Sequence, residues 1–289
     1  MTKFVIFDEK QAEKDLLEYV ITGAHAERSA CEKNGTAAQD ALKDILLSSS
    51  DEKRHEYSLA GQKIIAKFVA KDIKNTNHSK LIEGVFEFVR SEALSQAITL
   101  DKDKLAEDGI DIADFSNYLY KPTYFVRFSP NKFAKSFNNS LFTATDDMYG
   151  LETEELVRRI IFNKERHVML DEYYTNVMRP FKMMKDLKFT SSMGTVSKVA
   201  NKPVWDINAI IQTYGDDFII KYGKAKLTEL TRFVEIGAIP KSVISESQIV
   251  IDRRLDFMVM TEEAERRAMD MYGNILAQKA KRNLTRSFA

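Results

Sequence analysis

The chain has 289 residues, of which 44% are hydrophobic and 30% are charged. This composition is typical of a folded globular protein and excludes a largely disordered one. Its 43 basic and 43 acidic residues balance, so a site for a polyanion has to arise from local separation of charge. The single cysteine, Cys31, excludes an internal disulfide bond and favours a reducing compartment.

The amino-terminal residues turn polar at once, and no apolar run approaches the roughly 20 residues that span a bilayer. We therefore expect no signal peptide and no membrane partner. The expected location is intracellular, which means the host cytoplasm or the virion if the protein is viral.

In chain order, residues 1–8 predict a short extended arm or strand. Apolar residues at helical spacing then predict a helical N-lobe over residues 9–117. Its expected helices cover residues 9–22, 24–33, 37–47, 52–74 and 81–97, with an Asn34-Gly35 turn and an acidic linker from 101 to 117. The N-lobe is thus expected to be a bundle of short helices.

A central basic and aromatic segment is expected over residues 118–203. It contains a strand at Tyr124–Phe128, a helix start at Ser129-Pro130-Asn131, a long helix from Thr153 towards Pro180, and a mobile basic loop at 188–203. The strand would aim the amino terminus of the following helix at an anion.

A helical C-lobe is expected over residues 204–283, followed by a basic tail at 284–289. Residues 245–260 fit either a helix or a strand, and a last helix begins near Thr261. The predicted fold is mainly α, with two helical lobes, a central groove, an extended amino-terminal arm and at most a little β.

Motifs for catalysis or metal binding are missing from the sequence. The four histidines form no metal-binding pair, and no glycine-rich phosphate loop occurs. The acidic pairs Asp146-Asp147 and Asp216-Asp217 suit either a Mg²⁺ site or the first turn of a helix, where negative charge complements the helix dipole. We expect no catalytic residue, no metal and no cofactor.

The stretch from Tyr118 to Phe142 interleaves cations with aromatic rings and has no acidic residue, a pattern that suits single-stranded nucleic acid. The alternative is a buried strand whose aromatic residues belong to the core. If this stretch faces the basic segment 179–202 across a groove, Tyr124 and Phe128 would stack on bases, whereas Phe125 and Phe133 would be core. The expected phosphate contacts are Arg127, Lys132, Lys135, Lys185, Lys188, Lys198 and Lys202.

The run from Val126 to Ala134 resembles a conserved block of plant emaravirus nucleoproteins, and the run from Tyr214 to Phe218 falls where that family has an aromatic and acidic block. The chain departs from the family by the insertion of Ser129-Pro130 and by its neutral charge. The stretch from Phe115 to Phe128 is also similar to early proteins of tailed phages. Both resemblances imply a viral protein that works near nucleic acid.

The first hypothesis is a non-enzymatic, nucleocapsid-like viral protein that coats single-stranded RNA or DNA, with RNA favoured. It would self-associate through its amino-terminal arm and carboxyl-terminal tail. The alternatives are a virion assembly or protein-interaction component that binds no nucleic acid, and, more remotely, a metal-dependent enzyme that uses Asp216 or Asp217.

Overall fold

A computed structural model describes residues 7–89, 93–137 and 148–287. The chain is 57% helix and 24% strand, and its described part has eight strands in three sheets. The fold is therefore mixed α and β, and the prediction of a mainly α chain with at most a little β is wrong. The error arises where β-branched and aromatic residues also fit a helical spacing.

The chain divides into two compact units, each built from separate stretches of sequence. Unit 1 takes three stretches, which are residues 1–69, 124–199 and 255–289. Unit 2 takes the remaining two, which are residues 70–123 and 200–254. The expected N-lobe and C-lobe are thus each divided between the two units.

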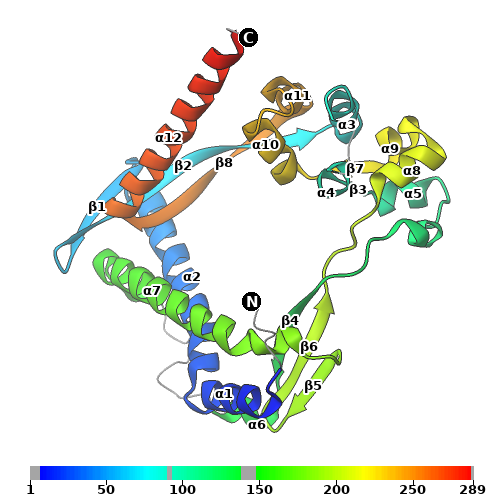
Figure 1. Ribbon diagram of the computed structural model, residues 1–289. Coiled ribbons are helices and arrows are strands. Elements are labelled where there is room, and N and C mark those ends of the chain that lie inside the picture. Colours follow the sequence, from blue (N-terminus) through cyan, green and yellow to red (C-terminus); the bar gives the residue numbers. More distant parts are fainter. Residues whose placement is uncertain (1–6, 90–92, 138–147, 288–289) are drawn as a thin grey trace. The chain divides into compact units, whose positions relative to one another are not determined.

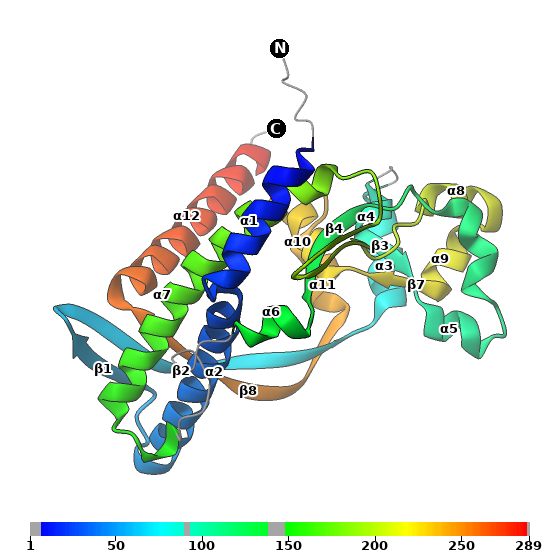
Figure 2. The ribbon, with the colours of Figure 1, turned by 90° about the horizontal axis from the view of Figure 1, so that it is seen from below.

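Unit 1 contains two long helices that pack along each other, α2 (Ala24–Ser49) and α7 (Thr153–Met178) (Figures 1 and 2). Its other helical elements are α1 (Glu9–Ile21), α6 (Lys132–Ser136), η3 (Met148–Gly150), η4 (Pro180–Met183) and α12 (Glu262–Ser287). Its strands are β1 (Arg54–Leu59), β4 (Tyr124–Pro130), β5 (Lys188–Ser191) and β6 (Gly194–Ala200), of which only the last residue, Ala200, is assigned to unit 2. Two further strands, β2 (Gln62–Thr76) and β8 (Gln248–Thr261), have residues in both units.

α2 is one continuous helix, so the predicted break at Asn34-Gly35 is wrong. The apolar residues before and after this dipeptide, such as Cys31, Ala38 and Leu42, are buried in the two cores of unit 1. Packing against α7 therefore outweighs the local turn preference, which is only about 1 kcal/mol for a glycine within a helix.

Ion pairs also join α2 to α7. Glu27 accepts two hydrogen bonds from Arg166, to Oε1 from Nε at 2.6 Å and to Oε2 from Nη2 at 2.8 Å. Arg28 donates from Nε to Asp171 at 2.9 Å, and its guanidinium lies 4.6 Å from the centre of the Tyr174 ring. Both pairs fix the register of the two helices.

The expected helix over residues 52–74 is instead the antiparallel hairpin β1–β2. Its two-residue turn is formed by Ala60 and Gly61, which both have positive φ angles, of 47° and 79°. Such turns match the twist of paired strands. Residues Ile64, Ala66 and Phe68 then alternate onto one face and enter the core that α2 and α7 share.

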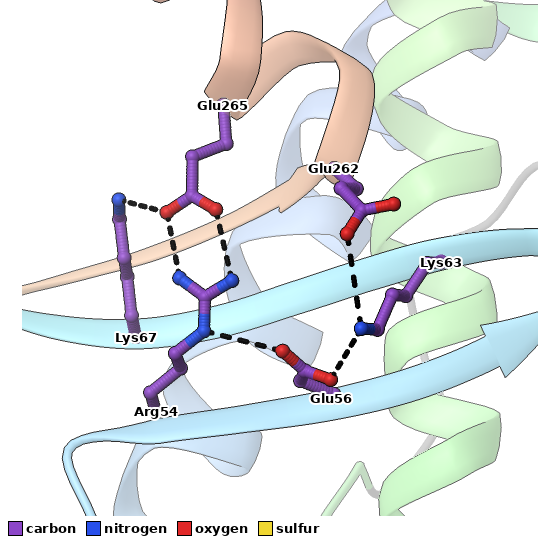
Figure 3. A network of polar contacts seen from close by, with 6 residues as sticks. All are labelled: Arg54, Glu56, Lys63, Lys67, Glu262 and Glu265. Carbon is purple, nitrogen blue, oxygen red and sulfur yellow. Dashed lines mark hydrogen bonds and ion pairs between the residues drawn. The ribbon is translucent and has the colours of Figure 1, made fainter. Parts of the chain in front are cut away.

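β8 extends this sheet in the order β1–β2–β8. Residues 245–260, which fit either a helix or a strand by sequence, therefore mainly form a strand. The helix predicted from Thr261 is confirmed as α12. Its first turn is held to the hairpin by a network of cations and carboxylates (Figure 3). The members of this network are Arg54, Glu56, Lys63, Lys67, Glu262 and Glu265.

Unit 2 has a core of its own, built on short helices and a two-stranded sheet of β3 and β7. Its elements before the central segment are α3 (His78–Phe86), α4 (Leu94–Ala97), β3 (Ile98–Leu100), α5 (Lys102–Glu107) and η1 (Ile112–Tyr118). Those after it are α8 (Ile207–Tyr214), α9 (Asp216–Tyr222), β7 (Gly223–Ala225), α10 (Leu227–Glu235) and α11 (Lys241–Glu246).

Candidate nucleic-acid interface

The predicted basic segments meet in one sheet of unit 1, with the strand order β4–β6–β5 (Figure 1). The stretch 188–203, predicted to be a mobile loop, is mainly the antiparallel hairpin β5–β6. The central stretch and the basic loop are therefore neighbouring strands and not the facing walls of a groove.

Hydrogen bonds at its two ends fix the register of β4 against β6. The Asn131 N–H donates to the Met193 carbonyl at 3.0 Å, and the Asn201 N–H donates to the Thr123 carbonyl at 2.8 Å. In an antiparallel ladder these two bonds mean that Arg127 lies opposite Ser197.

The inner face of the sheet packs on a core formed with α1, α2 and α7. Val126 and Phe128 of β4, Val196 of β6 and Phe189 of β5 all belong to this core. The ring of Phe128 lies 5.5 Å from the ring of His25, edge to face. Burial and then the charge of Arg28 lower the pKa of His25, so the ring behind Phe128 is neutral at neutral pH.

The outer face carries the alternate residues, and its centre is cationic. Ser197 lies between Arg127 of β4 and Lys188 of β5. Since neighbouring strands are about 4.8 Å apart, the two cations are separated by about 10 Å across the sheet. Phe125, two residues before Arg127, is 45% exposed and therefore offers part of its ring to solvent. Hydroxyl groups complete this face, on Ser129, Thr190, Thr195 and Ser197.

The outer sheet face, defined by Phe125, Arg127, Lys188 and Ser197, has uncompensated positive charge. No residue of the three strands is acidic. Neither Arg127 nor Lys188 forms an ion pair with any residue that the structure describes, whereas Arg28 and Arg166 of the same unit each bind a carboxylate. The free cations are thus available to an anionic ligand.

The structure changes the roles expected for the aromatic residues. Phe128 is 5% exposed, so it belongs to the core and offers no face to a base. Phe125 and Phe133, which the sequence analysis placed in the core, are 45% and 56% exposed. Tyr124 is 44% exposed at the start of β4. The period of two in β4 separates Phe125 from Val126 and Phe128, which share the inner face, whereas Phe133 lies on α6.

The expected phosphate contacts separate into three groups. Lys132 and Lys135 are exposed on α6, and Lys185 is exposed in the segment before β5. Lys198 is half-buried, and its ammonium group donates to the Met184 carbonyl within the inner side of the sheet. Lys202 is exposed but belongs to unit 2.

The predicted helix start after β4 is confirmed, with Asn131 as the cap of α6. Its side-chain oxygen accepts the Ala134 N–H at 2.8 Å. This bond already satisfies a backbone donor that the sequence analysis assigned to an anion, and the helix has only five residues. The amino terminus of α6 is therefore no part of the candidate site.

The acidic pairs do not assemble a metal site within the described residues. Asp216 and Asp217 lie in the first turn of α9, where negative charge complements the helix dipole. Asp146-Asp147 lies outside the described residues. Cys31 is buried, and burial raises the pKa of its thiol, which disfavours the reactive thiolate.

Comparisons with known proteins found no relative of this chain. No protein-family model matches the chain, and no curated protein or solved structure matches it. The resemblance to nucleoproteins therefore stays a prediction. Among the described helices, none combines the length and the apolar character needed to cross a membrane.

Proposed function

We propose that the protein binds single-stranded nucleic acid, with RNA favoured, on the outer sheet face of unit 1. The observation that carries the proposal is the row Arg127, Ser197 and Lys188 beside the exposed ring of Phe125, on a sheet without a carboxylate. Cations that neutralise phosphates supply affinity without sequence preference, and an exposed ring supplies stacking.

The arrangement favours a single strand over a duplex. An open sheet face with an aromatic ring suits unstacked bases, because every base has a flat face on which to stack. Stacking contributes about 1–3 kcal/mol per base by alanine substitution. Lys132, Phe133 and Lys135 of α6, which follow β4 directly, would extend the bound strand.

The test is binding of a fluorescently labelled single-stranded oligouridylate, followed by anisotropy over a range of salt concentrations. Reversing both cations, Arg127→Glu and Lys188→Glu, is expected to weaken binding at least tenfold. The slope of the logarithm of the binding constant against the logarithm of salt concentration should fall by about 0.7 for each lost phosphate contact.

A matched control is Lys14→Glu with Lys33→Glu, which changes the net charge by the same amount. Both lysines are exposed on α1 and α2 of the same unit. This control is expected to retain most of the binding, because it leaves the outer sheet face intact. Equal loss in both double variants would show that only the net charge matters and would refute the proposed site.

The nucleocapsid-like role further requires self-association, for which the expected contacts are the amino-terminal arm and the carboxyl-terminal tail. Residues 1–6 and 288–289 lie outside the described part, and α12 extends through residue 287. Size-exclusion mass, measured with the ratio of absorbance at 260 and 280 nm, tests this role. A nucleic-acid-free oligomer would support the alternative of a protein-interaction component.

A further inference from the structure

β8 lies at the edge of its sheet, where the strand order is β1–β2–β8 and β2 is its one neighbour among the described strands (Figure 1). It has 14 residues, whereas strands usually have about 5–6. An edge strand presents a row of backbone N–H and C=O groups that can pair with another strand, and proteins often block such a row with proline. β8 contains no proline, so its free edge can accept a partner strand.

The middle of β8 is exposed and partly apolar. Phe257 and Val259, towards its carboxyl-terminal end, are buried in the core that α2 and α7 share. Alternation places Leu255 and Ile251 on the same face of the strand, but these two residues are 46% and 63% exposed. The apolar row of β8 thus continues beyond the residues of that core into solvent, which is typical of a surface that binds another protein.

Charged residues of both signs, Asp252, Arg253 and Arg254, lie between the two exposed apolar residues, and all three are exposed. Arg253 Nε donates to Asp72 of β2 at 3.0 Å, so this cation has a counter-ion in its own chain. Asp252 forms no ion pair with any residue that the structure describes, and Arg254 shares its face of the strand by alternation. One face thus carries an acid and a base two residues apart.

We propose that β8 pairs antiparallel with β8 of a second copy of this chain, about a two-fold axis at Arg253. Directly opposite residues of an antiparallel pair lie on the same face and contact each other. With this axis, Asp252 lies opposite Arg254 of the second copy. Likewise, Ile251 lies opposite Leu255 of the second copy. The symmetry repeats both contacts, so the interface gains an ion pair and an apolar pair on each side of the axis and closes as a dimer.

The charges select this register over its neighbours. Moving the axis to Asp252 would place this aspartate opposite itself and Ile251 opposite Arg253. Moving it to Arg254 would place two Arg254 side chains opposite each other. Like charges directly opposite destabilise a pair of strands. In the proposed register Arg253 meets its own copy, and the Asp72 bound to each Arg253 offsets that repulsion.

The pairing ends before Phe257, because the Phe257 carbonyl already accepts a hydrogen bond from Gln39 Nε2 of α2 at 3.2 Å. It involves none of the residues of the outer sheet face, which lie on β4, β5 and β6. Dimerisation through β8 therefore does not depend on the proposed binding of nucleic acid, which the oligouridylate titration tests separately. It gives the expected self-association a surface other than the amino-terminal arm and the carboxyl-terminal tail.

The experiment is analytical ultracentrifugation of the full chain, freed of nucleic acid by nuclease treatment, from micromolar to millimolar concentration. A reversible equilibrium between monomer and dimer is expected. Asp252→Arg and Arg254→Asp each place like charges opposite each other on both sides of the axis, so each should raise the dissociation constant of the dimer at least tenfold. The double variant with both exchanges restores opposite charges in reversed order, and its dissociation constant should return to near the native value.

Two further variants separate the interface from general effects. Ile251→Lys removes the apolar pair at an exposed position and should also weaken the dimer at least tenfold. Glu83→Arg is the matched control, because it makes the same change of charge as Asp252→Arg at an exposed position of α3, and it should leave the dissociation constant unchanged. Thermal melting followed by circular dichroism shows which variants keep the fold, and the double charge exchange keeps the test decisive if one single variant fails to fold.

A chain that stays monomeric at millimolar concentration would overturn the proposal. So would a dimer that Asp252→Arg and Ile251→Lys leave unchanged, because self-association would then use another surface. A double charge exchange that does not restore the dimer, while Glu83→Arg stays dimeric, would refute the axis at Arg253 and with it the proposed pairing.

Discussion

Arg54 of β1 and Glu265 of α12 form a two-pronged ion pair, with Nη1 to Oε1 at 2.8 Å and Nη2 to Oε2 at 3.0 Å (Figure 3). Lys67 of β2 also binds Oε1. Glu265 is 5% exposed although it lies in the first turn of its helix. The pair therefore joins elements that are more than 200 residues apart in sequence and fixes where α12 begins.

Replacing Glu265 by glutamine is expected to destabilise the protein by about 1–3 kcal/mol, because the charge-assisted hydrogen bonds from Arg54 and Lys67 weaken and both cations lose this carboxylate. Chemical denaturation followed by circular dichroism measures the change. Glu263→Gln is the matched control, since Glu263 pairs with Arg267 on the exposed side of the same helix. Its effect should stay within about 0.5 kcal/mol, and equal effects of the two variants would contradict the assigned role of the buried pair.

Acid should remove the contribution of Glu265. Hydrogen bonds from Arg54 and then Lys67 lower the pKa of its carboxyl group from 4.5 to about 2. A pKa that is lower in the folded state stabilises the protein fully above pH 4.5, and this stabilisation is lost as the pH falls towards 2. The difference in unfolding free energy between the native chain and Glu265→Gln should thus be constant from pH 7 to 5 and shrink below pH 4.5. A difference that grows on acidification would refute the assignment.

The pair Glu27 and Arg166 is expected to show strong coupling between α2 and α7. In a double-mutant cycle with alanine at each position, the coupling energy should be about 1–3 kcal/mol, because Glu27 is buried and both of its oxygens are bonded. The exposed pair Arg232 and Glu229 of α10 should give about 0.5 kcal/mol or less. Similar coupling energies for both pairs would show that the burial of Glu27 does not strengthen its interaction with Arg166.

Gly194, at the start of β6, allows β6 to lie close to β4 in the candidate interface. Its φ is +143°, and a Cβ there would lie 2.3 Å from the backbone oxygen of Ser129 on β4. Gly194→Ala should therefore part the two strands locally and cost at least about 2 kcal/mol. Gly61→Ala is the control, with a positive φ but open space around the added atom, and should cost about 1 kcal/mol. Thermal melting compares them, and a neutral Gly194→Ala would contradict the close approach of β4 and β6.

Several elements were predictable from local patterns. The apolar spacing of α7 and α12 and the acidic residues in their first turns gave the correct helices. β4 was recognised from its aromatic and β-branched content and from Pro122 before it and Pro130 at its end. These segments have one clear period, so local sequence and tertiary packing agree.

Other elements were missed because a second period fitted equally well. Ile64, Ile65, Phe68 and Val69 suit a helix by spacing, but the turn at Ala60 and Gly61 and the pairing with β1 and β8 make them a strand. The stretch 188–203 was missed for a different reason: it is polar, with little apolar content, yet hydrogen bonding with β4 gives it sheet structure. Pairing partners distant in sequence leave no local signal.

The sequence by itself determined that a basic, aromatic and acid-free stretch exists, and which residues it contains. Only the tertiary structure decided which of its side chains face solvent, because the alternation of a strand places Phe128 inside and Phe125 and Arg127 outside once one face is buried. The structure also placed Lys188 beside Ser197 and Arg127, since hydrogen bonds between strands, not proximity along the chain, set neighbours across a sheet.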